Sequence, residues 1–496
     1  MRLITILAFS LLALFGCNNS DPGSAETGNT GNTVTTPSNT INTSSSANRP
    51  PSESPEIHVQ VNGLQGGKAY LVGIFADQQY GIDSAQIDGA GRMLFKRAEP
   101  YKSGFVFVWL QPTQESIQMI IDSDQTFSMT TNSGSIIQSM QVSGSKDNEL
   151  LFKHLNQQMV SQPQIDALNK QMQALQEGSL NYNNLKTQRD ALIEERQSGL
   201  KADFEAHPEL FYTKFKFAGQ NPELVEKKLP DGTIDKEHQI YMFRSQFWDN
   251  VDLSDERLLY TPVLANKLKR YINELTPQHQ DSIIKSAKYV VDRSLASPET
   301  FKFFSNWIAL NYEPEKTTLM DPEAVHVFMV QNYFTNERAF WADSLEVYAL
   351  QKRAGEMASS LLNKQGPNVT ANDPQGVSRS IYDSKKPFVV VFMFNPDCDH
   401  CREEAPQLKG FYYQWQDQVD IFTIALDTND QEWRQFLQSY SMPGTHVYDP
   451  TNKAIYAKYY VDNTPEIYIL DSDRKIVAKN LKVKQIGEVL QREIDK

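Results

Sequence analysis

The sequence predicts a multidomain protein with an N-terminal β-rich part, an all-helical middle and a C-terminal α/β part. Three observations predict this order. Short alternating apolar and polar segments run from Glu56 to about Val142, and helical periodicity follows from about Asn148 to Lys364. A buried strand then leads into a helix that begins with two cysteines. With 496 residues, 40% of them hydrophobic, the chain is long enough for two or three cores.

The N-terminus has the pattern of a secretion signal. Arg2 precedes an apolar run, Leu3–Phe15, and the small residue Gly16 precedes Cys17. The run is too short to span a membrane as a helix. Its ending resembles a bacterial lipobox, which implies that Cys17 is acylated; an ordinary signal peptide with a free Cys17 is the alternative. Because Asn18 follows the cysteine, the resemblance implies attachment to the outer membrane, facing the periplasm.

Residues 18–55 are dominated by Ser, Thr, Asn, Gly and Pro. Such a composition cannot bury enough apolar surface to become ordered, so it predicts a disordered tether between the lipid and the folded parts. The net charge of −13 argues against nucleic-acid binding and against a polybasic membrane face. We therefore expect contact with the membrane through the lipid anchor alone.

Residues 56–145 are expected to form an antiparallel β-sandwich or barrel. Ile57–Val61 and Phe105–Trp109 are two of the alternating segments, and turn signals such as Gly66-Gly67 and Asp88-Gly89 separate them. No catalytic constellation is visible in this part. An interaction or spacer role is the interpretation that the pattern favours.

Residues 146–365 are expected to form a helical domain. Ile165, Leu168 and Met172 step by three or four residues, which predicts a helical hairpin that is broken at Gly178-Ser179. Three further helix starts are predicted where a capping residue precedes a proline: Thr276-Pro277, Ser297-Pro298 and Asp321-Pro322. The aromatic residues of this part are expected in its core and not in a ligand cage: Phe301, Phe303, Phe304, Trp307 and Tyr312.

Cys398 and Cys401 stand where a strand meets a helix. The continuous apolar run Phe388–Phe394 precedes them and predicts a strand buried on both faces. Apolar residues at helical spacing, such as Leu408 and Phe411, follow them. Unpaired N–H groups and the helix dipole favour a thiolate at Cys398. Two thiols so placed can open and close a disulfide, so the expected cofactor is none beyond a redox-active disulfide between them.

The predicted order over residues 366–496 is strand, helix, strand, helix, two strands and helix. With the thiol pair after the first strand, it resembles a thioredoxin fold, and more closely the membrane-tethered TlpA/ResA type of thiol–disulfide oxidoreductase. The resemblance implies that Cys398 is the exposed nucleophile, that Cys401 resolves the mixed disulfide and that Glu404 handles the proton. It also implies a substrate-binding cis-proline at Thr464-Pro465 that faces the thiols. The β-rich and helical parts resemble uncharacterised modules that precede such domains.

The residues next to the pair set opposing electrostatic effects. Asp397 and Asp399 oppose formation of the Cys398 thiolate, whereas the helix terminus and a protonated His400 favour it. We therefore expect Asp399 and His400 to tune the pKa of the Cys398 thiol. The sequence leaves open whether the net effect raises or lowers this pKa. Asp397 also departs from the tryptophan that most relatives carry. The sequence thus leaves open whether the pair reduces or oxidises its partners.

The resulting expectation is a periplasm-facing lipoprotein that exchanges disulfides with client proteins, with an unknown redox partner. A binding or scaffold protein of the envelope is the alternative, and envelope stress sensing by the same pair is a third class. For the pair itself, half a zinc site, a structural disulfide, peroxidase chemistry and copper delivery are the alternatives. A zinc site needs four ligands, and the sequence has no second C-x-x-C.

Overall fold

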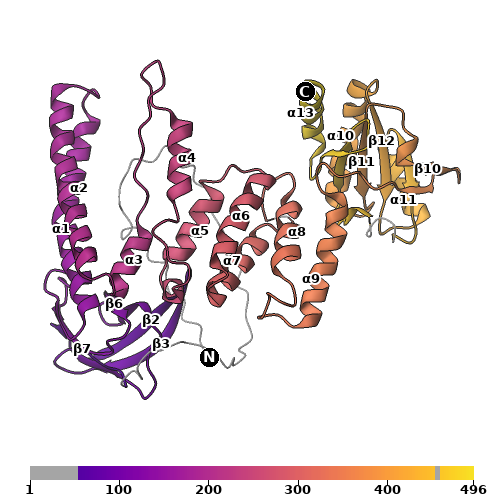
Figure 1. The fold of residues 1–496 in the computed structure, drawn as a ribbon. Coiled ribbons are helices and arrows are strands. Elements are labelled where there is room, and N and C mark those ends of the chain that lie inside the picture. Colours follow the sequence, from indigo (N-terminus) through magenta and orange to yellow (C-terminus); the bar gives the residue numbers. More distant parts are fainter. Residues whose placement is uncertain (1–53, 315, 453–457) are drawn as a thin grey trace. The chain divides into compact units, whose positions relative to one another are not determined.

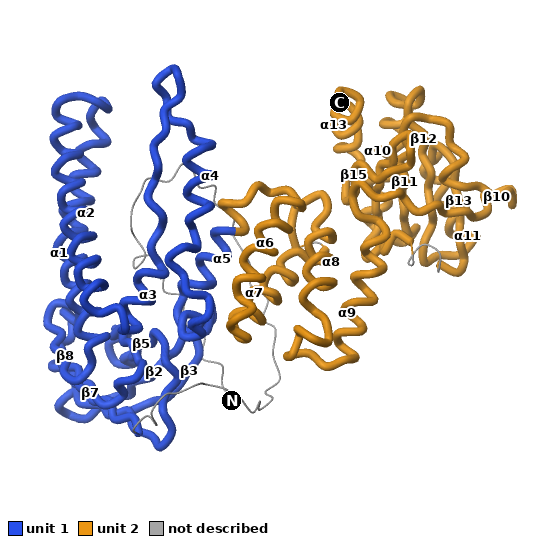
Figure 2. Tube along the Cα trace, in the orientation of Figure 1, with its two compact units in different colours: residues 1–271 blue, residues 272–496 orange. Residues whose placement is uncertain are grey.

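The computed structural model describes residues 54–314, 316–452 and 458–496. Cys17 and nearly all of the expected tether lie outside the described residues. The chain divides into two compact units, residues 1–271 and 272–496 (Figure 2). The division falls near the end of α5 (Val263–Asn273). The helical segment expected over residues 146–365 therefore contributes to both units.

The β-rich part of unit 1 consists of two four-stranded sheets, ordered β4-β1-β7-β8 and β3-β2-β5-β6 (Figure 1). Along β1, the side chains of Ile57, Val59 and Val61 are buried, and the residues between them face outward, as the period of a strand requires. β1 pairs in parallel with β7, so the expectation of an all-antiparallel arrangement is wrong at this pair. The crossover between them runs through all four strands of the other sheet. The strands are β1 (Glu56–Asn62), β2 (Gly67–Phe75), β3 (Gln78–Ile87), β4 (Arg92–Lys96), β5 (Gly104–Leu110), β6 (Ser116–Ile121), β7 (Thr126–Asn132) and β8 (Gln141–Ser143).

The predicted helical hairpin of unit 1 is confirmed as α1 (Lys146–Gln173) and α2 (Leu180–Ala206). The side chain of Ser179 caps α2, and Ile165 and Met172 are buried along the seam. The buried side chain of Asn148 joins α1 to β6, because its amide accepts from the N–H of Ile120 and donates to its carbonyl, both at 2.8 Å. The remaining helices of unit 1 are α3 (Phe211–Gly219), α4 (Lys236–Gln246) and η2 (Glu256–Tyr260). Within the described part of the chain, no helix combines the length and the apolarity needed to cross a bilayer.

The first half of unit 2 is helical, and its core contains the expected aromatic residues Phe301, Phe304 and Tyr312. Ser297 and Asp321 cap their helices and a proline follows each, as expected. The start expected at Thr276-Pro277 is wrong, because the helix begins at Gln280 and the Thr276 hydroxyl is instead buried against Ser286 at 2.8 Å. The helices are α6 (Gln280–Ser294), α7 (Pro298–Asn311), α8 (Pro322–Tyr333), α9 (Ser344–Met357) and η3 (Ala358–Ser360).

The second half of unit 2 is a seven-stranded sheet, ordered β10-β9-β13-β12-β11-β14-β15. Its central strand β11 (Phe388–Phe394) is buried along its whole length, since layers cover both faces. The helices α10 (Asp399–Trp415), α11 (Asp430–Tyr440) and α13 (Val483–Ile494) pack on the face that carries Val390 and Phe392. The other elements are β9 (Thr370–Asn372), β10 (Ser378–Ser380), η4 (Ile381–Asp383), β12 (Val419–Ala425), β13 (Thr445–Tyr448), β14 (Glu466–Leu470) and β15 (Ile476–Ala478).

Candidate active site

The thiol pair lies where β11 passes into α10. Cys398 is the N-cap of α10, and its sulfur lies 3.4 Å from the backbone N of Cys401, which donates to it. The N–H of Cys398 is held by the carbonyl of Asn395 at 3.1 Å. Both cysteines are free thiols; Cys398 is partly exposed and Cys401 is fully buried. Cys398 is therefore the sulfur that another molecule can reach.

A second segment of the chain closes over Cys398. The Cys398 thiol donates a hydrogen bond to the carbonyl oxygen of Thr464 at 3.0 Å. The Thr464–Pro465 peptide bond is cis, as the resemblance implied. Glu466, the next residue, begins β14 and pairs with Met393 near the end of β11. The pairing of these two strands thus brings together the sulfur and the proline loop, which are far apart in the sequence.

The two thiols differ in acidity. The pKa of Cys398 is lowered from its ordinary value: burial acts to raise it, but hydrogen bonds with the Thr464 side chain, with the backbone and side chain of Cys401 and with the backbone N–H of His400 outweigh that effect. Burial raises the pKa of Cys401 to about 12. At neutral pH, the exposed sulfur is therefore the better thiolate and the buried sulfur holds its proton.

Arg402 pairs with both carboxylates that flank Cys398. Its guanidinium lies 3.1 Å from Asp397 and 3.2 Å from Asp399, and its Nε donates to the carbonyl of Pro396 at 3.0 Å. The ion pairs therefore partly neutralise the repulsion that Asp397 and Asp399 were expected to exert on a Cys398 thiolate. Arg402 was not predicted as a site residue, although its spacing of three residues from Asp399 at a helix start indicates an ion pair on one helix face.

The other predicted site residues on α10 make contacts of their own. His400 lies 3.4 Å from Glu403, and both side chains are well exposed. Glu404 is half-buried, and its carboxylate accepts the N–H of Val483 at 2.7 Å. Val483 is the first residue of α13, so Glu404 joins α10 to the N-terminus of that helix. Its role in proton handling stays a prediction.

A charged cluster beside the proline loop was not predicted from the sequence. Glu466 directly follows Pro465, and burial raises the pKa of its carboxyl group to about 8, against the opposing effect of Lys479. The Lys479 ammonium is 2% exposed and lies 3.4 Å from Glu323 and 3.9 Å from Asp321. The two acids come from the start of α8, so partners in this cluster are separated by about 150 residues.

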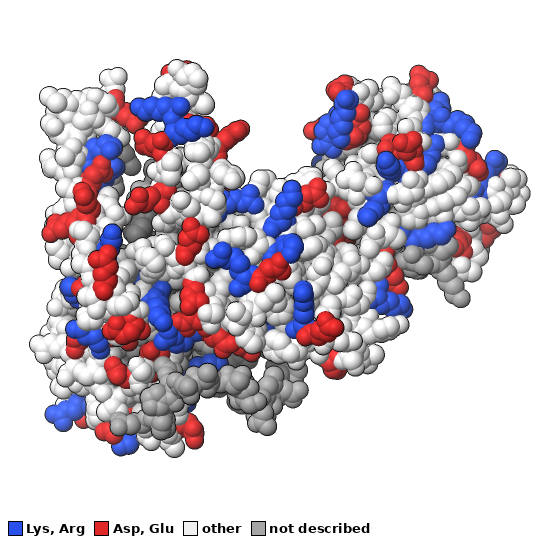
Figure 3. Space-filling model, in the orientation of Figure 1, with Lys and Arg blue, Asp and Glu red and all other residues white. Residues whose placement is uncertain are grey.

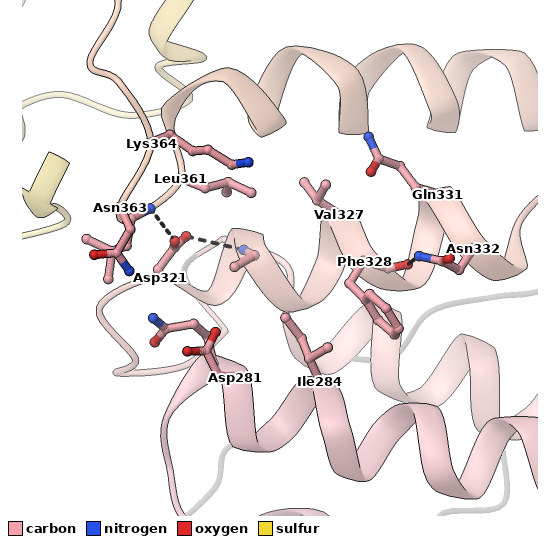
Figure 4. A pocket seen from close by; sticks show the side chains of 13 residues that line it. Asp281, Ile284, Asp321, Val327, Phe328, Gln331, Asn332, Leu361, Asn363 and Lys364 are labelled. Atoms are coloured by element: carbon pink, nitrogen blue, oxygen red, sulfur yellow. Dashed lines mark hydrogen bonds between the residues drawn. The ribbon is translucent and has the colours of Figure 1, made fainter. Parts of the chain in front are cut away.

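Other features of the described residues do not add to the thiol site. No group of three or more His, Cys, Asp or Glu side chains there could hold a metal ion. A cavity of about 270 Å³ lies between α6, α8 and residues 361–364, and Asp321 stands at its edge (Figure 4). Its lining contains no cysteine. On the face shown in Figure 3, basic and acidic side chains are interspersed and form no continuous basic surface.

Two segments of the chain match family models. Residues 386–476, which include the thiol pair, Glu404 and Thr464-Pro465, match a family described as thioredoxin-like. Residues 56–151 match a domain of unknown function (DUF4369). No curated protein matches the chain.

Several solved structures resemble parts of the chain. One is a thioredoxin-like protein from Bacteroides caccae, with 16% identity over 55% of this chain and 99% of that one, at a TM-score of 0.44. Another is the thioredoxin domain of a thiol-disulfide oxidoreductase from Bacteroides vulgatus, with 25% identity over 26% and 96% and a TM-score of 0.26. A third is a thiol:disulfide interchange protein from Bacteroides sp., with 23% identity over 28% and 93% and a TM-score of 0.26.

Proposed function

We propose that this chain, which carries a thioredoxin-like domain over residues 386–476 and the DUF4369 module over 56–151, is a thiol–disulfide oxidoreductase that acts on client proteins. One observation supports the proposal most. A reachable sulfur with a lowered pKa stands beside a buried sulfur with a raised pKa, opposite the Thr464-Pro465 loop. This inequality favours disulfide exchange, because the reachable sulfur can attack as a thiolate while the buried sulfur keeps its proton until the second step.

The exchange proceeds in two steps. The Cys398 thiolate attacks one sulfur of a client disulfide, so a Cys398–client bond forms and the second client sulfur leaves as a thiolate that takes up a proton. Cys401 then loses its proton and attacks the Cys398 sulfur. The Cys398–Cys401 disulfide forms, and the first client sulfur leaves and is protonated. Two electrons have passed from the pair to the client, and the reverse sequence oxidises a client dithiol.

The client is held at the proline loop in this proposal. An extended client segment pairs with the backbone beside Thr464 and Pro465, as a strand added to a sheet edge would. Its disulfide is then presented to Cys398, whose sulfur already contacts the Thr464 carbonyl at 3.0 Å. In the second step, Glu404 receives the proton of Cys401. A separate dithiol or disulfide partner returns the pair to its starting state.

We also place the protein in the cell envelope, anchored through acylated Cys17 and facing the periplasm from the outer membrane. The support is the short apolar run that ends at Gly16-Cys17. A polar segment between the lipid and the folded parts would let the thioredoxin-like domain reach clients away from the membrane surface. Labelling with radioactive palmitate in wild type and in Cys17→Ala tests the anchor, and an unlabelled wild type would refute it.

Trapping of clients tests the proposed reaction. Cys401→Ala should accumulate client proteins in disulfide linkage to Cys398, whereas Cys398→Ala should trap none, since the buried sulfur cannot be reached. Both variants are compared on non-reducing gels of envelope fractions. If Cys401→Ala traps nothing while an intact thioredoxin-like domain still binds partners without a disulfide, the scaffold alternative holds. Titration of the pair against glutathione gives its potential and so the direction of exchange.

A further inference from the structure

The segment that leads into the proline loop is held by the helical part of unit 2. Residues 458–462 run directly before Thr464-Pro465. The hydroxyl of Ser359 donates to the carbonyl of Lys458, and the hydroxyl of Ser360 donates to the carbonyl of Tyr459 at 2.8 Å. Both serines belong to η3, at the end of α9. The main chain of this segment is thus fixed by residues that lie about 100 positions earlier in the sequence.

Arg353 on α9 holds the next part of the same segment. Its Nε donates to the hydroxyl of Tyr460 at 2.6 Å, and its Nη2 lies 3.3 Å from the carboxylate of Asp462. Its Nη1 lies 3.8 Å from Glu313, which helps to fix the guanidinium. Asp462 stands two residues before Thr464, so one side chain of the helical part reaches close to the site of the chemistry.

Tyr460 has a backbone conformation that needs such support. Its φ is +49°, in the left-handed region that a bulky L-residue rarely occupies. A residue persists in that region only when its surroundings determine its position. The hydrogen bond from Arg353 fixes the end of the Tyr460 side chain, and Ser360 fixes the carbonyl just before it. The direction in which the chain enters the proline loop therefore depends on both contacts.

We propose that Arg353 is a positioning residue for disulfide exchange: through Tyr460 and Asp462, it sets the place of Thr464 and so the register of an extended client segment. The thioredoxin-like domain is then completed, for client recognition, by α9 and η3. Neither family-model match extends to Arg353. This inference rests on the proposed function and adds the element that determines how the client backbone is received.

Two disulfide substrates distinguish a role of Arg353 in positioning the proline loop from a role in the stability of the fold. An extended peptide disulfide uses the loop, whereas 2-hydroxyethyl disulfide is too small to pair with it. For Arg353→Met, we expect KM for the peptide to rise about fivefold or more, which corresponds to the net contribution of roughly one ordinary hydrogen bond, while the rate with the small disulfide changes less than about twofold. Arg353→Lys should restore only part of the effect, because an ammonium cannot bind both partners in the same fork.

Arg338→Met is the matched control. Arg338 also lies in the helical part, where it donates to the carbonyl of Asn332 at 2.8 Å. Its replacement should leave KM for both substrates unchanged. Tyr460→Phe removes one hydrogen-bond partner of Arg353, and Asp462→Asn removes the negative charge of another, each with little change of shape. Both variants should raise KM for the peptide alone. Combined with Arg353→Met, each should add less than its own single effect, because the variants remove the same contact.

Each outcome decides the matter. The inference is overturned if Arg353→Met changes neither substrate, or if it slows both equally, which would mark a structural role. It is also overturned if the double variants are fully additive. Should Arg353→Met fail to fold, Tyr460→Phe carries the test with the same two substrates. If the wild type exchanges with neither substrate, the proposed function fails first, and that result is distinct from a failure of the variants alone.

Discussion

The guanidinium of Arg402 lies 3.1 Å from the carboxylate of Asp397, the residue directly before the exposed thiol. The same group reaches Asp399 on the other side, so one cation balances two anions that bracket Cys398. The local sequence contains opposing effects and left open whether they raise or lower the pKa of Cys398; in the structure this pKa is lowered. Hydrogen bonds with the Thr464 side chain and with the backbone N–H groups of Cys401 and His400 account for the lowered pKa. The ion pairs of Arg402 reduce the opposing effect that the two carboxylates would have.

Replacement of Arg402 by Gln should raise the pKa of Cys398 by about half a unit, because exposed charges interact weakly across solvent. The rate of Cys398 alkylation by iodoacetamide, measured against pH, reports the change. Asp397→Asn should shift the same profile in the opposite direction. An unchanged or lowered pKa in Arg402→Gln would show that the pairing has no influence on the thiol.

Replacement of Glu404 separates its two roles. Glu404→Ala should lower the free energy of unfolding by about 1 kcal/mol, since the Val483 N–H loses its acceptor. Glu404→Gln keeps an oxygen that can accept this bond, so its stability should stay near that of the wild type. Glu404→Gln cannot carry a proton, and the second step of exchange should slow in single-turnover measurements. Equal rates in the Glu404→Gln variant and the wild type would confine Glu404 to the helix contact.

The raised pKa of the half-buried Glu466 should make stability depend on pH. The folded state keeps this proton up to a pKa of about 8, whereas the unfolded chain releases it near 4.5. The folded state therefore binds more protons between these values, and its advantage declines as pH rises through that window. Glu466→Gln removes the titrating carboxyl group, so the free energy of unfolding of the variant should not decline in this way. The difference in this free energy, variant minus wild type, should therefore increase by on the order of 1–3 kcal/mol between pH 5 and pH 8. Urea unfolding of both proteins at the two pH values checks the sign.

Replacement of Lys479 by Met should destabilise the protein by about 3 kcal/mol, because Asp321 and Glu323 then lack their buried cation. The loss should be smaller at pH 5, because burial raises the pKa of Asp321 to about 6 and its carboxyl group can then take up a proton. Lys475→Met, an exposed lysine four residues earlier, is the control and should change unfolding by less than about 0.5 kcal/mol. An equal effect in both variants would contradict a role for the cluster.

Strong local patterns in the sequence predicted the elements that carry the thiols. The predicted bounds of β11 agree with the structure, since a seven-residue apolar run leaves one interpretation. β9, β10 and β13 were not predicted, because strands of three or four residues have no periodicity to detect. The helix start predicted at Thr276 was wrong for another reason. The Thr276 hydroxyl is hydrogen-bonded to the Ser286 hydroxyl, and His279 is the N-cap of the helix instead.

Within the site, the thiols and the proline loop could be predicted from the sequence, whereas the cluster of charged residues that are distant in the sequence could not. The places of Cys398, Cys401 and Thr464 follow from a motif and a family resemblance. The surroundings of Glu466 depend on Lys479 and on residues of α8 that approach it only when the chain has folded. Neither spacing nor composition signals such a cluster, because each member alone is typical of an exposed, solvated side chain.

The complete enclosure of Cys401 has a practical consequence for chemistry on the folded protein. A bulky maleimide added to the reduced protein should reach the sulfur of Cys398, which is partly exposed. It should not reach the sulfur of Cys401, which is buried in the core with Ala405 and Leu408. Modification should stop at a single adduct in this domain. A dye or spin label could thus be installed at one defined point, next to the loop that receives the client, without any engineered cysteine.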